Sequence, residues 1–291
     1  MFTTITGTAL KQVLYFYVKG HKMKSSTEVN IDIKLIDFVD SLNLSINAMK
    51  CLKLLLANEE LQAAQEYANK VSIVRLGFND HGPVHMRTVA LNAVIMLNLL
   101  KKAGIKTSLE SDECGNFEDS VIAVIIAGLF HDLGMGMGRQ EHELHSMILA
   151  QPYIDKFLNE LYGNDLHKKT MLRTVALEGI RGHMGTITVS SIEAGIIQVA
   201  DGCDMTKGRA RIAMQSNAKT GHIHQYSANS IEEVTLTAGK EKPIRIDVHM
   251  SNEVGFFQVE EVLMVKIAQS TAKSYIELYA NVMGDSEKRY L

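Results

Sequence analysis

From residue 31 to about residue 221, apolar residues recur every three or four positions, a spacing that predicts α-helices. The segment 121–130 is apolar on nearly every face, so its helix should be buried at the centre of the fold. Helices are expected over residues 33–42, 49–56, 84–100, 121–130, 139–152, 166–180 and 190–201. Pro152 should stop or kink one of them, and Ser190 with Glu193 resembles a capping box that opens another.

After about residue 221, the spacing of apolar residues changes from helical to alternating, which predicts strands. The segment 244–250 shows the alternation most clearly, with Ile, Val or Met at every second position. Strands are expected over residues 234–237, 244–250 and 275–280, and a helix over residues 257–269. The order β-β-α-β is that of a small α+β module.

We therefore predict a mainly α protein with three parts. A helical bundle covers residues 31–221, and the small C-terminal α+β module covers residues 222–291. Residues 1–30 are polar and weakly patterned, and they form a segment of unknown role in which Met23 is a second candidate start besides Met1. The module has no chemical motif. We consider two roles for it, regulation and dimerisation, of which the second would make the chain a homo-oligomer.

The composition excludes several classes of protein. The chain has 291 residues, 46% of them hydrophobic, and its net charge of −3 offers no attraction for nucleic acid or an anionic membrane. Its longest apolar run, residues 121–130, is shorter than the ~20 residues that a membrane-spanning helix needs, and no signal peptide is visible. Cys51, Cys114 and Cys203 are odd in number and widely spaced, which is typical of reduced thiols in a cytoplasmic protein.

Histidine is the unusual component of the chain, with eleven residues. Histidines and aspartates follow one another near the ends of predicted helices, in the order His81, His85, His131, Asp132, His142, His145, His183, Asp201 and Asp204. Imidazole and carboxylate groups together bind Zn, Mn, Fe, Ni or Co rather than Ca. An adjacent His-Asp pair at the end of an apolar helix needs buried partners. The sequence therefore predicts one or two divalent transition-metal ions, with Mg as an additional candidate.

This order of residues resembles the HD superfamily of metal-dependent phosphohydrolases, whose signature H…HD…D runs across a helical bundle. The resemblance covers roughly residues 80–209. It implies a first metal site made by His85, His131, Asp132 and Asp201. The segment 141–149 is similar to the HPxxG helix of two-metal members, which implies that His142 and His183 bind a second metal. Asp132 would then bridge the two ions.

A second resemblance, to the cyclic-nucleotide phosphodiesterases of this superfamily, concerns His81. In those enzymes a histidine four residues before the first ligand donates a proton to the leaving oxygen, and His81 stands four residues before His85. A group that titrates near neutrality is suited to this role, and Asp132 would orient the attacking water. The alternative for His81 is to cap a helix or to support a metal ligand.

The positions that bind phosphate in related enzymes are only partly matched. The HD-GYP cyclic-dinucleotide phosphodiesterases carry a lysine where this chain has Met135, and the chain lacks their GYP segment, which disfavours cyclic di-GMP as the substrate. Arg139 is the expected substitute for the lysine, because a guanidinium can bind two phosphate oxygens. Lys207 and Arg209, together with Arg211, are expected either to bind phosphate as well or to lie on a solvated helix face.

Two residues are expected to support metal ligands by hydrogen bonds. Asp204 follows Asp201 by three positions, so the two carboxylates should lie on the same side of a helix. His145 lies one helical turn after His142, and it is either a support for that residue or the ligand in its place.

The sequence thus predicts a cytoplasmic, metal-dependent phosphohydrolase, a phosphatase or phosphodiesterase, that cleaves a phosphate mono- or diester. Its partner would be a nucleotide or another small phosphorylated metabolite, and neither nucleic acid nor a membrane is expected as a partner. Three alternatives stay open: a di-iron HD oxygenase, a non-catalytic sensor that binds metal or another ligand, and a metal that only holds the helices together.

Overall fold

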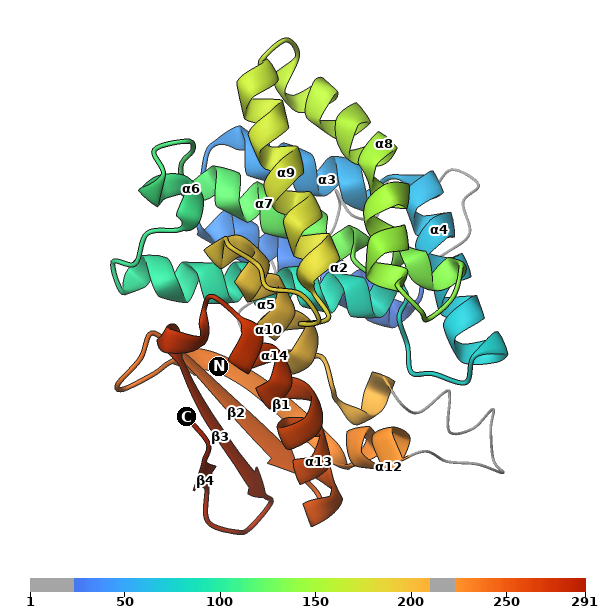
Figure 1. Ribbon diagram of the computed structural model, residues 1–291, viewed down its shortest axis with the longest axis vertical. Helices are drawn as coiled ribbons and strands as arrows, with labels where there is room; N and C mark the ends of the chain where they lie inside the picture. Colours follow the sequence, from blue (N-terminus) through green and yellow to red (C-terminus); the bar gives the residue numbers. More distant parts are fainter. Residues whose placement is uncertain (1–23, 210–222) are drawn as a thin grey trace.

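The computed structural model describes residues 24–209 and 223–291 of the chain (Figure 1). Met23 and Arg211 lie outside the described residues, as does most of the predicted N-terminal segment. The predicted boundary near residue 222 also falls outside them.

The first described part is helical throughout. Its elements are α2 (Ser26–Ser41), α3 (Ile46–Leu56), α4 (Glu59–Lys70), the π-helical turn η1 (Val71–Arg75), α5 (Pro83–Lys102), α6 (Ser108–Ser111), α7 (Phe117–Phe130), the 3-10 turn η2 (Leu133–Gly136), α8 (His142–Tyr162), α9 (Leu166–Gly182) and α10 (Ile192–Cys203). Local signals define several starts: Asn116 and Asp119 form a reciprocal capping box at α7, and Pro83 opens α5.

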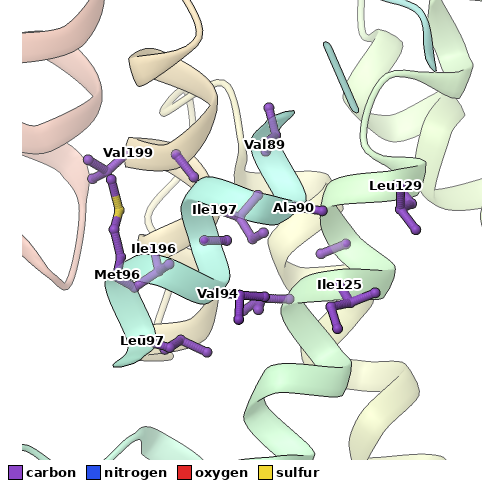
Figure 2. Packing of buried hydrophobic residues seen from close by; sticks show 14 of the residues in the cluster. Val89, Ala90, Val94, Met96, Leu97, Ile125, Leu129, Ile196, Ile197 and Val199 are labelled. Atoms are coloured by element: carbon purple, nitrogen blue, oxygen red, sulfur yellow. The ribbon is translucent and has the colours of Figure 1, made fainter. Parts of the chain in front are cut away.

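Helix α7 lies at the centre of the helical part, as its uniformly apolar sequence predicts. All but one of its 14 residues are buried, and it packs against α5 and α9. Gly128 permits the close approach to α5, because a Cβ atom there would lie 2.7 Å from Cα of Ala90. Figure 2 shows side chains of α5, α7 and α10, among them Val94, Ile125 and Ile197, in one hydrophobic cluster.

Two segments, Pro83–Lys102 and Phe117–Gly136, are long and apolar enough to cross a membrane by length and composition alone. In the folded protein, 61% of the apolar window in the first and 94% of that in the second are buried. Burial in the core of the fold explains these segments, and a membrane location is not indicated.

The C-terminal part is a small α+β module with a four-stranded sheet. Its elements are α12 (Ile223–Ser230), β1 (Ile231–Ala238), β2 (Ile244–Met250), η3 (Glu253–Gly255), α13 (Phe256–Gln258), η4 (Val259–Leu263), α14 (Met264–Gln269), η5 (Lys273–Tyr275), β3 (Ile276–Val282) and β4 (Lys288–Arg289). The strand order is β1-β2-β3-β4, and only the β2–β3 pair is parallel. The crossover from β2 to β3 carries α14, which packs against α10 (Figure 1). The predicted fold class is confirmed, with the short β4 as an addition.

The helix boundaries predicted at Pro152 and at Ser190 differ from the structure. Helix α8 does not stop at Pro152 but continues through it. The carbonyl that loses its donor there belongs to Ile148, which is 58% exposed, so water can satisfy it. The cap of α10 is Ser191, whose hydroxyl accepts from the amide of Ala194. Glu193 instead turns away and binds amides of α6, at Ser108 and Leu109, and the Ser120 hydroxyl of α7.

Candidate metal centre

Six polar side chains from five helices meet in the interior of the helical part. His85 lies in the first turn of α5, His131 and Asp132 follow α7, His142 opens α8, His183 follows α9, and Asp201 lies in the last turn of α10. None of the six is more than 5% exposed. Burying this many polar groups is costly unless they share a partner.

Each of the four histidines is oriented by a hydrogen bond from its Nδ1 atom. The acceptors are the Asp204 carboxylate for His85, at 2.6 Å, and backbone carbonyls for His131, His142 and His183, at 2.9, 3.0 and 2.7 Å. With the proton on Nδ1, the lone pair lies on Nε2. The Nε2 atoms of His85 and His131 are 3.0 Å apart, and those of His142 and His183 are 3.1 Å apart. Metal-binding histidines are held in this way.

The carboxylate of Asp132 lies between these two pairs of histidines. Its Oδ2 atom is 3.2 Å from Nε2 of His85 and 3.3 Å from Nε2 of His131. Its Oδ1 atom is 3.2 Å from Nε2 of His142 and 3.5 Å from Nε2 of His183. When the four rings are neutral, as metal binding requires, their Nε2 atoms have no proton to give, and both oxygens of Asp132 are then buried without a hydrogen-bond donor among the described residues. A cation beside each oxygen would satisfy them.

The donor set therefore fits metal ions. The groups that could hold an ion are His85, His131 and Asp201, and His131, Asp132 and His183. Within each group the three ligand atoms lie within 4.8 Å of one another. Imidazole nitrogens with carboxylate oxygens are the ligands of divalent transition metals. The predicted ligands are thus brought together, with the carboxylate of Asp132 between the two pairs of histidines.

Comparisons with known proteins agree with this geometry. Residues 84–206 match the HD domain family, and this segment contains all six residues of the cluster. Uncharacterized protein MJ1020 of Methanocaldococcus jannaschii is 42% identical over 228 residues, which cover 78% of this chain and 86% of that protein. The chain belongs to the HD superfamily of metal-dependent phosphohydrolases. No solved structure gives a significant match.

The six-residue cluster is called the HD centre below, and its carboxylates change the pKa values of its histidines. Burial and the charge of Arg209 lower the pKa of His85, but contacts with Asp132 and the other surrounding carboxylates outweigh both and raise it to about 10. Burial lowers the pKa of His183 to about 4, because its contact with Asp132 compensates only in part. Without metal, His85 therefore keeps a second proton at neutral pH, whereas His183 is already in its metal-binding form.

His81 lies beside the HD centre, on the loop before α5, with its ring centroid 5.9 Å from that of His85. Its Nδ1 atom donates to the carbonyl of Asn79 at 2.6 Å and lies 2.9 Å from the hydroxyl of Ser72, which leaves the lone pair on Nε2. Burial lowers the pKa of His81 well below its ordinary value, and the charge of Arg209 adds to this effect. The ring is therefore neutral until a bound anion raises its pKa.

The loop after the HD pair positions the first turn of α8. The amide of Gly134 donates to the hydroxyl of Ser146 at 2.8 Å. A Cβ atom at Gly134 would lie only 2.0 Å from the carbonyl oxygen of His142, so this loop needs glycine to lie against the helix. The sequence predicted that this helix starts near Arg139, but it begins at His142. Glu141, just before it, has a left-handed φ of 52°, which no helical residue adopts.

A cavity of about 510 Å³ opens beside the HD centre, between the helical part and the C-terminal module. His81, Asp132, His183 and Asp201 line it on the side of the metal ligands. The C-terminal module supplies Ala228, Gln258, Glu261, Val262, Val265 and Lys266. The cavity thus has a charged side at the HD centre, and the side formed by the C-terminal module mixes apolar residues with Gln258, Glu261 and Lys266.

Two of the three predicted phosphate-binding residues line this cavity. Arg139 and Arg209 lie on its wall, and Nη2 of Arg209 is 3.0 Å from Nε2 of His85. Lys207 lies elsewhere: it is half-exposed and forms an ion pair with Glu232 of β1. Of the two alternatives predicted for Lys207, this position favours a solvated surface over contact with phosphate, because Glu232 of the C-terminal module holds its ammonium group.

Of the two residues predicted to support metal ligands, Asp204 is hydrogen-bonded to a ligand, whereas His145 has no such bond among the described residues. Asp204 accepts the hydrogen bond from His85, which is the role that the sequence suggested. Its backbone has already left the helix, since α10 ends at Cys203. His145 has a buried Nδ1 atom with no partner among the described residues, and the ligand position of α8 is occupied by His142.

Sequence reasoning missed two charged residues at the centre. Glu143 lies next to His142, with Oε2 3.3 Å from its Nδ1, and also pairs with Arg181. Lys266 of α14 contacts the carboxylate of Asp201. Burial would raise the pKa of Asp201, but this ammonium group holds it well below its usual range. The sequence signal that could have revealed Lys266 is a lysine within an otherwise apolar face of the predicted helix.

Proposed function

We propose that this HD protein is a phosphohydrolase that cleaves a phosphate mono- or diester of a nucleotide or another small phosphorylated metabolite. One observation carries the proposal: the two oxygens of Asp132 face two different pairs of histidines and have no other partner among the described residues. A purely structural metal would need one closed set of ligands. A carboxylate shared between two positions is suited to a two-metal hydrolytic centre.

The residues around Asp132 provide the other parts of such a reaction. Divalent ions held there would activate water and neutralise the phosphoryl oxygens. Asp132 would orient the water, and the guanidinium groups of Arg139 and Arg209 would hold the phosphoryl group from the cavity wall. His81 would act as general acid after the negative charge of the substrate has raised its pKa.

The shape of the cavity supports a small substrate. Its volume of about 510 Å³ lies within the usual range for small-molecule sites. Met184, Met205 and Val262 add apolar side chains to the lining of the cavity, where they would contact the organic part of a phosphate ester. A nucleotide combines a charged end with a flat, weakly polar base, and it suits a lining that is partly charged and partly apolar.

The ligand set favours some ions over others, and the cysteines favour one cellular location. Four imidazoles favour Mn, Fe, Zn, Ni or Co over Mg, which prefers oxygen ligands, although Mg could assist through the substrate phosphate. Cys51 and Cys203 are buried free thiols, and a cytoplasmic location agrees with them.

The proposal is tested by elemental analysis of the purified protein together with a phosphate-release screen over nucleotides and other phosphate esters. We expect close to two transition-metal ions per chain and metal-dependent release from at least one ester. Asp132→Ala should lose both metal and activity, whereas replacing the exposed Asp112 by Ala should change neither. Iron with dioxygen uptake and no phosphate release would indicate an oxygenase. Full metal occupancy without any turnover would indicate a sensor.

A further inference from the structure

Lys266 is a buried cation on the inner face of α14. The neighbouring positions on this face, Leu263, Ile267 and Ser270, are also buried, so the lysine interrupts a mostly apolar stripe. Lys266 is only 6% exposed. A lysine in such a stripe is unfavourable for packing alone, because a buried charge needs a partner of opposite sign and further hydrogen bonds.

The ammonium group finds those partners at the metal centre. It contacts Oδ2 of Asp201 and donates to the backbone carbonyl of His183 at 3.2 Å. The other oxygen of Asp201, Oδ1, faces the cluster, 3.2 Å from Nε2 of His85. The two oxygens of this carboxylate are therefore divided: one is directed to the candidate metal site and the other is held by Lys266.

Helix α10 is shaped to receive α14 at this point. A Cβ atom at Gly202 would lie 3.0 Å from Cδ1 of Leu263 and 3.3 Å from Cδ of Lys266, so the glycine makes room for the lysine stem. At Gly195, two turns earlier, a Cβ atom would lie 2.1 Å from Oγ1 of Thr271. The C-terminal module thus packs tightly on the helix that carries Asp201 (Figure 1).

We propose that Lys266 is a positioning residue, supplied by the C-terminal module, that fixes Asp201 with one oxygen toward the metal. The inference rests on the proposed metal centre and gives the module a role that its sequence did not reveal: the centre is complete only when the module is docked. Groups that hold a metal ligand in place commonly change metal affinity or activity by about 10–100-fold when they are removed.

The test uses the full chain, stripped of metal and titrated with Co²⁺ by calorimetry and visible absorption. Lys266→Met keeps the aliphatic stem but removes the ammonium group. We expect its Co²⁺ affinity to fall by about 10–100-fold. The visible spectrum of the Co²⁺ that does bind should change, because Oδ2 of Asp201 is then free to approach the ion. Turnover of a phosphate ester at saturating metal should show a lower kcat with little change in KM.

Thr271→Val is the matched control. The hydroxyl of Thr271 donates to the carbonyl of Ser191 at 2.7 Å, so this variant also breaks a bond between the module and α10 but does not touch Asp201. It should keep the wild-type Co²⁺ affinity and spectrum. If both variants change alike, Lys266 serves only to dock the module. If Lys266→Met retains the wild-type affinity and spectrum, the proposal is wrong.

Two further arms keep the result interpretable. Lys266→Gln retains a hydrogen-bond donor without the charge, and it replaces Lys266→Met should that variant fail to fold. It should lose affinity in the same direction. A wild-type protein that binds no Co²⁺ would refute the metal centre itself. A wild-type protein that binds Co²⁺ but hydrolyses no ester would refute the proposed reaction while the affinity and spectrum still decide the role of Lys266.

Discussion

Nδ1 of His85 donates a hydrogen bond to Oδ2 of Asp204 across 2.6 Å, although the two residues lie 119 positions apart in the chain. The other three histidines of the centre give their Nδ1 protons to backbone carbonyls, which no substitution can remove. Unlike these three, His85 gives its Nδ1 proton to a side chain, so its tautomer depends on a residue that can be replaced. This difference makes the orientation of His85 open to a direct test.

Replacing Asp204 by Ala should weaken binding of the metal that His85 holds by about 10–100-fold, because the ring loses both its fixed orientation and a partner that increases its basicity. Asp204→Asn retains an acceptor oxygen, so its metal affinity should fall less than that of Asp204→Ala. Calorimetric titration with Zn²⁺ or Mn²⁺ measures the effect, and the exposed Asp112→Ala serves as control. Equal affinity in all three proteins would show that Asp204 does not support His85.

The clustering of the candidate metal ligands was predictable from the sequence because these residues lie at helix boundaries that the sequence itself marks. The apolar run of α7 ends at His131 and Asp132, and Pro83 fixes the start of α5 just before His85. The order of these groups along the chain was enough to indicate that they bind the same metal ions. Their division into two pairs around the oxygens of Asp132 required coordinates.

The contribution of the C-terminal module was not predictable in the same way. Lys207 and Arg209 are two positions apart, yet one pairs with Glu232 and the other reaches His85. Which of them faces the centre depends on where β1 lies, and local sequence carries no information on that. Lys266 is 65 positions from Asp201, and only the docking of α14 on α10 brings them together.

His81→Ala should retain metal but lose turnover, and the loss should depend on the leaving group. A general acid is worth about 10²–10⁴-fold where the leaving oxygen is a strong base and much less where it is a weak one. The measurement compares kcat for an alkyl phosphate ester with kcat for a p-nitrophenyl ester. His167→Ala, at an exposed position, is the control. Normal turnover of the alkyl ester by His81→Ala would exclude His81 as the acid.

Gly134→Ala should disturb the second metal position more than the first. The new Cβ atom would overlap the carbonyl oxygen of His142, so the first turn of α8 must move and carry the imidazole with it. We expect the bound metal to fall from two ions toward one, with a loss of about 1–3 kcal/mol in the free energy of unfolding. Both are measurable, by elemental analysis and by urea denaturation.

Gly136→Ala is the matched control for this loop. Its Cβ atom would lie 3.4 Å from the nearest side-chain atom, Cδ1 of Tyr67, which is an ordinary contact. The variant should keep both metal ions and nearly all of the stability. A similar loss of metal in both variants would indicate that the loop responds to any added side chain, and not that Gly134 in particular positions His142.

The raised pKa of His85 predicts how pH acts on the metal-free protein. The pKa is about 10 in the folded chain against an ordinary value of 6.5, so folding favours the protonated ring. This contribution to stability is fully present below about pH 6.5 and is lost as the pH rises toward 10. The free energy of unfolding, measured in the presence of a chelator, should therefore fall across this range by a smaller amount in Asp204→Ala than in the wild type.

The same shift sets the pH dependence of metal binding. The imidazolium of His85 must give up one proton before Nε2 can bind an ion, so metal affinity should rise by up to about ten-fold per pH unit between pH 6.5 and 10. His183, with a pKa of about 4, has no proton to lose from Nε2 in this pH range. Ring-nitrogen NMR of the metal-free protein at pH 8 separates the two: His85 should be an imidazolium and His183 a neutral ring. A neutral His85 at that pH would mean that the carboxylates of Asp132, Asp201 and Asp204 do not hold its proton. Metal affinity would then be nearly independent of pH.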